Sequence, residues 1–145
     1  MPTWTPVVTW ILIALGWAVA YRIALTIANN NNKRSDLNKK KDLIVTLINE
    51  IIEDNISYWS DKKTTSLGTL IMYKLTRLSD EIETVPYSQT QSSQLHHLYI
   101  KYKQNITLND EFLTPTVLSE SDKDLLLQEA ISSARELEEA IKKLV

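Results

Sequence analysis

The chain has 145 residues and a formal net charge of −2, with no cysteine, two glycines and four prolines. This length leaves room for one domain besides a membrane segment, and the lack of cysteine excludes disulfides, a catalytic thiol and thiolate metal sites. The scarcity of glycine and proline disfavours a turn-rich β fold and predicts an all-α protein.

The first predicted element is a transmembrane helix over Val7–Ala28, which contains a single charged residue. At 1.5 Å per residue this helix is about 33 Å long, enough to cross a hydrocarbon core of about 30 Å. The six residues before it include no Lys or Arg, whereas a cleaved signal peptide begins with basic residues. We therefore expect residues 1–28 to be a retained anchor rather than a cleaved signal or a buried soluble helix.

A basic collar follows the anchor within residues 29–41. Its basic members are Lys33, Arg34, Lys39, Lys40 and Lys41. Basic residues hold the adjacent flank of a membrane helix in the cytoplasm, so we predict that the N-terminus is outside and the C-terminal domain is cytoplasmic. The same charges can bind anionic lipid headgroups.

Arg22 lies near the cytoplasmic end of the predicted membrane helix. Its long side chain is expected to snorkel to the lipid headgroups; the alternative is a charge that faces a pore or a partner's acid.

One face of the membrane helix is predicted to form a contact stripe. Gly16, Ala20, Ala24 and Ala28 recur every four residues, which brings small side chains into line and allows a second helix to approach closely. The stripe favours self-association in the membrane. Because alanine is common in membrane helices, a chance spacing is the alternative.

Residues 42–145 form the predicted cytoplasmic domain, which is acidic, with seventeen acidic residues against ten basic ones. Such a balance disfavours nucleic acid as a partner. Apolar residues at three-and-four spacing predict four amphipathic helices, over 36–60, 65–83, 91–106 and from 120 almost to the end, the last with Ser119 as its N-cap. Short connections favour an antiparallel four-helix bundle.

Two points about these helices remain open. The segment 91–106 also alternates in the manner of a strand, and the helix from Asp36 either starts anew or continues the membrane helix. The predicted core-facing residues include Ile44, Leu47, Ile48, Ile51, Tyr58, Trp59, Leu70, Ile71, Leu75, Leu78, Ile82, Leu95, Tyr99, Tyr102, Ile106, Leu125, Ala134, Leu137 and Ile141.

No known catalytic or phosphate-binding motif occurs in the sequence. His96 and His97 are adjacent, so on a helix they point about 100° apart and cannot hold one metal together; we expect one to line the core and the other to face water. Glu50, Glu53 and Asp54 are expected to form a solvated face. We therefore predict no catalytic residue, no metal site and no cofactor.

The first 45 residues resemble small bacterial single-pass membrane proteins carried by prophages and defence islands. The resemblance lies in Gly16-Trp17 within a short anchor, in Arg22, and in the stretch Asp36-Leu-Asn-Lys-Lys-Lys-Asp-Leu-Ile44 that opens a cytoplasmic helix. It implies a location in the bacterial inner membrane and a role in phage defence, superinfection exclusion or a related membrane-effector system. It brings no catalytic residues with it.

These observations lead to three functional hypotheses. The first is a non-enzymatic interaction or regulatory protein that contacts membrane lipid and either a protein partner or a second copy at the cytoplasmic face. The second is an effector or phage-exclusion protein that oligomerises and perturbs the membrane. The third is an enzyme built on polar residues of the bundle that the sequence does not identify.

Overall fold

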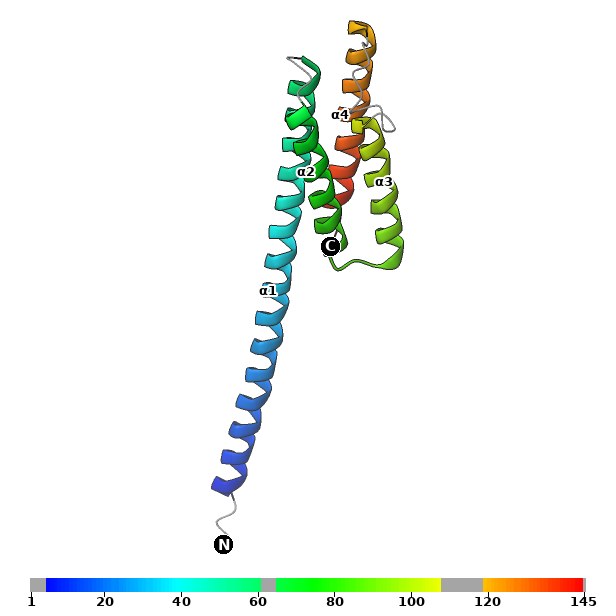
Figure 1. Cartoon of the computed structure of the whole chain (residues 1–145). Helices are drawn as coiled ribbons and strands as arrows, with labels where there is room; N and C mark the ends of the chain where they lie inside the picture. Colours follow the sequence, from blue (N-terminus) through cyan, green and yellow to red (C-terminus); the bar gives the residue numbers. More distant parts are fainter. Residues whose placement is uncertain (1–4, 61–64, 108–118, 145) are drawn as a thin grey trace. The chain divides into compact units, whose positions relative to one another are not determined.

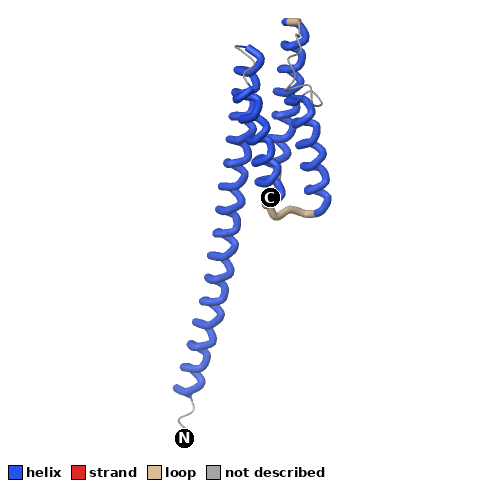
Figure 2. The backbone as a smooth tube through the Cα atoms, viewed as in Figure 1, coloured by secondary structure: helices blue, strands red, loops and turns tan. Residues whose placement is uncertain are grey.

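The structure, a computed structural model, describes residues 5–60, 65–107 and 119–144. These residues form four α-helices: α1 (Thr5–Ser60), α2 (Thr65–Glu83), α3 (Gln89–Thr107) and α4 (Glu120–Lys142) (Figure 1). Within the described ranges there is no strand (Figure 2). The predicted all-α class is confirmed, and the strand alternative for 91–106 is excluded.

The predicted membrane segment and the predicted helix over 36–60 belong to one element. α1 is 56 residues long, and from Trp17 to Ser60 it contains neither glycine nor proline, so no residue of that stretch breaks the helix. The polar run Asn29–Asn32 is therefore helical as well. The sequence left open whether the helix from Asp36 starts anew or continues the preceding helix, and the structure shows that it continues it.

The chain divides into two compact units, Met1–Asn38 and Lys39–Val145. In the first, the anchor unit, every described side chain from Val7 to Asp36 is exposed. In the second, the helical unit, apolar side chains form a buried core that begins at Ile44. Each unit is described separately below.

The core of the helical unit consists of apolar residues at helical spacing, as predicted. Burying one such side chain completely stabilises the fold by about 1.5–3 kcal/mol. The main buried residues are Ile44, Leu47, Ile48 and Ile51 of α1, Ile71, Leu75, Leu78 and Ile82 of α2, Leu95, Tyr99, Tyr102 and Ile106 of α3, and Ala130, Ala134, Leu137 and Ile141 of α4.

Two predicted core residues are instead exposed. Leu70 is 42% exposed and Leu125 is 57% exposed. Leu70 directly precedes the buried Ile71, and Leu125 precedes Leu126, which is partly buried. Adjacent helical residues point about 100° apart, so both leucines are turned away from the core.

Buried tyrosines connect α3 to two other helices. The Tyr102 hydroxyl donates a hydrogen bond to the Ile48 carbonyl of α1 at 3.2 Å, and the Tyr99 hydroxyl donates to the Leu75 carbonyl of α2 at 2.9 Å. Chiefly because they are buried, the pKa values of both phenols are raised above the ordinary value. Each tyrosine thus adds apolar area to the core and leaves its own hydroxyl hydrogen-bonded.

The start of α4 is stabilised by a local cap. The Ser119 side chain accepts a hydrogen bond from the Asp122 backbone N–H at 3.2 Å, which satisfies one of the free donors of the first turn. Glu120 and Asp122 lie in that turn and Lys142 lies in the last one, so the charges complement the helix dipole. The predicted N-cap is confirmed.

Candidate functional site

The first candidate surface is the apolar surface of α1 from Val7 to Ala28. This part of α1 is long and apolar enough to cross a membrane. Its large side chains are widely exposed, with Trp17 75% and Trp10 69% accessible. A soluble monomer rarely exposes a contiguous apolar surface of this size. The chemistry of the surface fits lipid or another apolar helix.

Small residues line one side of this surface at intervals of four. Gly16, Ala20, Ala24 and Ala28 are all exposed. A Cβ atom added at Gly16 would meet no atom of the described chain within 4 Å. The stripe is therefore open to a second helix.

Most of the predicted headgroup residues are exposed. Arg22, Lys33 and Arg34 are exposed in the anchor unit, and Lys39 is exposed in the helical unit. The Arg22 carbonyl accepts a hydrogen bond from Thr26 Oγ1 at 2.9 Å, within the helix, and this contact does not involve the guanidinium group. These four cationic side chains remain accessible to anions.

Lys40 and Lys41 make contacts of another kind, both inside the helical unit. Lys40 Nζ donates a hydrogen bond to the Thr84 carbonyl at 2.9 Å, directly after the end of α2. Lys41 Nζ donates to the Leu144 carbonyl, just after the end of α4. The last carbonyls of a helix lack partners within the helix and lie at the negative end of its dipole. Thr84 directly follows the last residue of α2, and Leu144 lies one residue beyond Lys143, the C-cap of α4, so the two lysines hold the chain where two different helices end.

The energies favour this capping over contact with lipid. A hydrogen bond to a charged group stabilises a protein by about 1.5–3 kcal/mol, whereas one Lys near an anionic membrane surface contributes about 1 kcal/mol. The bond of Lys41 is partly buried and is therefore weakened less by water than the bond of Lys40, which is exposed and contributes at most the lower end of this range. By this comparison, the hydrogen bond of Lys41 to the Leu144 carbonyl contributes more stabilising free energy than contact with a lipid headgroup would.

The sequence contains a signal for this role that the predictions overlooked. Lys40 and Lys41 stand four and three residues before Ile44, the first buried residue of α1. Residues at these spacings share a helix face, so both lysines lie on the side of α1 that carries the core stripe.

An ion-pair cluster joins α1 to α2. Lys74 Nζ lies 3.1 Å from Glu50 Oε2 and 2.7 Å from Asp54 Oδ2, and the Lys74 and Asp54 side chains are 18% and 23% exposed. Burial by itself lowers the pKa of Lys74, but hydrogen bonds to Asp54 and Glu50 and the attraction of their charges outweigh it and raise that pKa. The expectation of a solvated acidic face is wrong for Asp54, because α2 places Lys74 against it.

Both histidines of the chain lie on the outside of α3. His96 and His97 are exposed, and the expectation that one of them lines the core is wrong. The buried residues on either side are Leu95 and Tyr99, and both histidines fall between these two on the outer side of the helix. Among the described residues no group of three or more histidine or carboxylate side chains could hold a metal ion.

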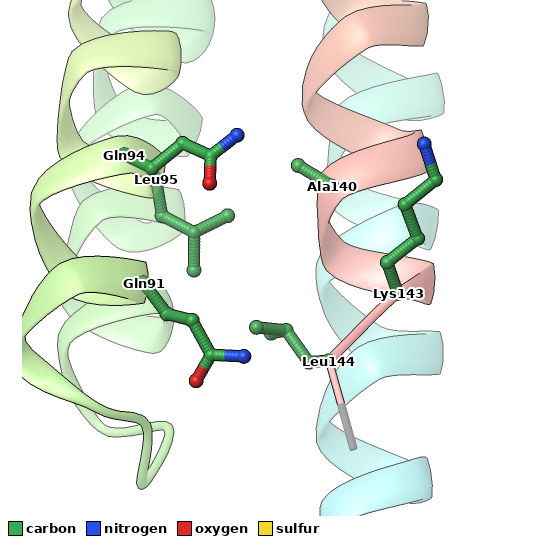
Figure 3. A pocket seen from close by; sticks show the side chains of 6 residues that line it. All are labelled: Gln91, Gln94, Leu95, Ala140, Lys143 and Leu144. Carbon is green, nitrogen blue, oxygen red and sulfur yellow. The ribbon is translucent and has the colours of Figure 1, made fainter.

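A small cavity of about 90 Å³ lies between α3 and α4. In Figure 3 the side chains of Gln91 and Leu144 point toward one another across it, while the Lys143 side chain runs along α4 away from α3. Its lining residues are Gln91, Gln94, Leu95, Ala140, Lys143 and Leu144. The volume is well below the roughly 300 Å³ or more that is usual for a small-molecule site.

A wider hollow of about 410 Å³ has a lining that comes from α4 alone. Its residues include Ile131, Arg135 and Glu136, and Glu136 pairs with Lys101 of α3 at 2.6 Å. One helix surface offers no convergent set of polar groups, so this hollow does not resemble a binding site for a small molecule.

Two exposed large apolar side chains of the helical unit lie on α2. Leu70 and Tyr73 are 42% and 64% exposed, and they stand three residues apart on the same face of the helix. Tyrosine is enriched at protein interfaces. We call these two residues the α2 patch.

A comparison of the chain with protein-family models, with curated proteins and with solved structures finds no match in any of the three.

Proposed function

We propose that the chain is a single-pass membrane protein of the bacterial inner membrane, with its N-terminus outside and an antiparallel helical bundle on the cytoplasmic side. It acts without catalysis, through protein–protein contacts at the membrane face. The observation that carries the proposal is the exposed apolar surface of α1 over Val7–Ala28, whose contact with water is unfavourable. The basic collar supports the orientation.

The absence of cysteine permits a direct test of the topology, since single cysteines can be introduced without a background. With Thr3→Cys, we expect a membrane-impermeant maleimide to label intact cells. With Ser121→Cys, at an exposed position of α4, we expect labelling only after the membrane is permeabilised. The reverse pattern would overturn the orientation, and recovery of both variants in the soluble fraction would overturn the anchor.

The α2 patch supports the proposed protein contacts. Leu70 and Tyr73 expose apolar area that a partner would bury, and large aromatic anchors supply much of the affinity at interfaces. We expect affinity purification of the full chain from mild detergent to recover a second copy or a specific protein.

A matched pair of variants tests the α2 patch. L70S/Y73S should abolish that recovery, whereas L125S, which changes another exposed leucine on α4, should not. Equal recovery with both variants would remove the α2 patch from the proposal. If the unmodified chain recovers neither itself nor a specific protein, the interaction role fails.

The second candidate function is an oligomerising effector that perturbs the membrane, or a phage-defence or exclusion protein of this kind. The open space over Gly16 favours it, because close approach of two helix backbones requires such space. G16I/A20I should then abolish assembly in detergent and the depolarisation caused by overexpression. A14I/A18I, which places the same bulk on another face of α1, should leave both unchanged. Indifference to G16I/A20I would leave α1 as a passive anchor.

A further inference from the structure

We propose that the basic collar carries out two separate tasks. The outer collar, Lys33, Arg34 and Lys39, binds the phosphate groups of anionic lipids. The inner collar, Lys40 and Lys41, holds the ends of α2 and α4 and does not serve lipid. This inference rests on the proposed membrane location. It assigns different roles to basic residues that stand close together in the sequence.

The side chains of the basic collar differ in how accessible they are to an anion. Lys33, Arg34 and Lys39 are exposed, whereas Lys40 and Lys41 are partly buried. The Lys39 side chain leaves α1 about 100° away from that of Lys40, so it points away from the helix ends that its neighbours hold. The residues of the outer collar are therefore more accessible to an anion than those of the inner collar.

Binding to lipid would break the hydrogen bonds that the inner collar makes within the helical unit. Moving Lys40 Nζ to a phosphate breaks its bond to the Thr84 carbonyl, and moving Lys41 Nζ breaks its bond to the Leu144 carbonyl. The freed carbonyls would have to find other donors at the negative ends of α2 and α4. The outer collar can bind lipid without any such loss.

The side chains of the outer collar fit the phosphate group of a lipid. Lys33 and Arg34 are adjacent, and the planar guanidinium group of Arg34 can donate two parallel hydrogen bonds to one phosphate while Lys33 supplies a point charge. The helical unit that follows has a net negative charge, so its overall charge does not attract anions. The outer collar therefore matches a phosphodiester headgroup such as that of phosphatidylglycerol.

Two double variants that remove the same charge test the inference. The full chain, K33Q/R34Q and K40Q/K41Q are each reconstituted in nanodiscs that contain phosphatidylglycerol and phosphatidylcholine, and the phosphatidylglycerol retained by each chain after mild detergent extraction is measured by native mass spectrometry. Hydrogen exchange is measured on the same samples at the ends of α2 and α4, where Thr84 N–H bonds to Asp80 and Leu144 N–H bonds to Ile141.

K33Q/R34Q should lower the preference for phosphatidylglycerol by roughly fivefold for each charge removed and leave hydrogen exchange at both helix ends unchanged. K40Q/K41Q should leave the lipid preference unchanged and speed exchange of the Thr84 and Leu144 amides. K39Q, alone, should lower the lipid preference by about as much as one charge of the first pair.

The proposal is overturned if K40Q/K41Q loses as much phosphatidylglycerol as K33Q/R34Q, or if K33Q/R34Q loses none. Should K40Q/K41Q fail to fold, the result with K33Q/R34Q decides, because Lys33 and Arg34 lie outside the helical unit. Failure of the unmodified chain to fractionate with membranes would instead contradict the proposed function. The two failures are therefore distinguishable.

Discussion

The buried hydroxyl groups of two tyrosines help to fix the position of α3 in the helical unit. The Tyr102 hydroxyl donates to the Ile48 carbonyl and the Tyr99 hydroxyl donates to the Leu75 carbonyl, so these two tyrosines hydrogen-bond α3 to α1 and to α2. A buried hydroxyl without a partner would destabilise the fold by about 1–3 kcal/mol. These two bonds favour a specific rotation and register of α3.

The buried Tyr102 predicts a loss of stability at alkaline pH. Burial raises the pKa of its phenol far above the ordinary value of 10.0, so the unfolded chain loses this proton at lower pH than the folded chain does. Above pH 10 or so the folded state therefore binds more protons, and the free energy of unfolding falls as pH rises. Below that pH the contribution of the neutral phenol is complete.

Tyr102→Phe should lower the free energy of unfolding by about 1 kcal/mol at pH 7, because the bond to the Ile48 carbonyl is lost. It should also make the decline between pH 9 and pH 11 shallower than in the unmodified chain. Urea unfolding of the full chain in mild detergent, followed by circular dichroism, measures both. Tyr73→Phe, at an exposed position, is the control and should change neither value. An unchanged alkaline slope in Tyr102→Phe would contradict the assignment.

At the scale of elements, the ends of the helices are stabilised by different means. α4 begins with a cap formed by its own neighbour, Ser119, whereas the ends of α2 and α4 are capped from a distance by Lys40 and Lys41 of α1. The cap at Ser119 depends only on residues close to it in the sequence. The contacts of Lys40 and Lys41 depend on which faces of the helices pack together.

Ser119→Ala should lower the free energy of unfolding by about 1 kcal/mol, because the Asp122 N–H loses its acceptor. Ser121→Ala is the matched control, since Ser121 lies exposed in the first turn of the same helix. Thermal unfolding in detergent and hydrogen exchange in the first turn of α4 report the difference. If both variants behave alike, the Ser119 cap contributes nothing to stability.

At the scale of the whole molecule, the two units differ in what covers their apolar residues. The buried apolar residues of the described chain begin at Ile44, and from Val7 to Asp36 every side chain is exposed. The described buried core of the helical unit therefore lies within Lys39–Val145.

A fragment that begins at Lys39 should therefore fold by itself. We expect it to be soluble, to give a helical circular dichroism spectrum and to unfold in one cooperative transition, because it retains the whole core and both inner-collar lysines. The full chain should fractionate with membranes and the fragment should not. A fragment without cooperative unfolding would indicate that the anchor unit contributes to the fold.

Local patterns in the sequence were enough to predict most of the helices. The bounds of α2 were predicted to the residue, α3 begins two residues earlier than expected, and the cap at Ser119 was identified from its residue type and the acids that follow it. Apolar spacing also identified the core stripes, because a helix repeats every 3.6 residues whatever it packs against. The apolar length of α1 was equally evident.

Only the tertiary structure decided the polar contacts between helices. The sequence presented Lys33 to Lys41 as one basic run, but Lys40 and Lys41 reach carbonyls 44 and 103 residues away. Lys74 lies against Glu50 and Asp54 in the same way, and nothing in the sequence around it indicates which acids it will meet. Periodicity determines which face of a helix is apolar, whereas the pairing of charges depends on how those faces pack together.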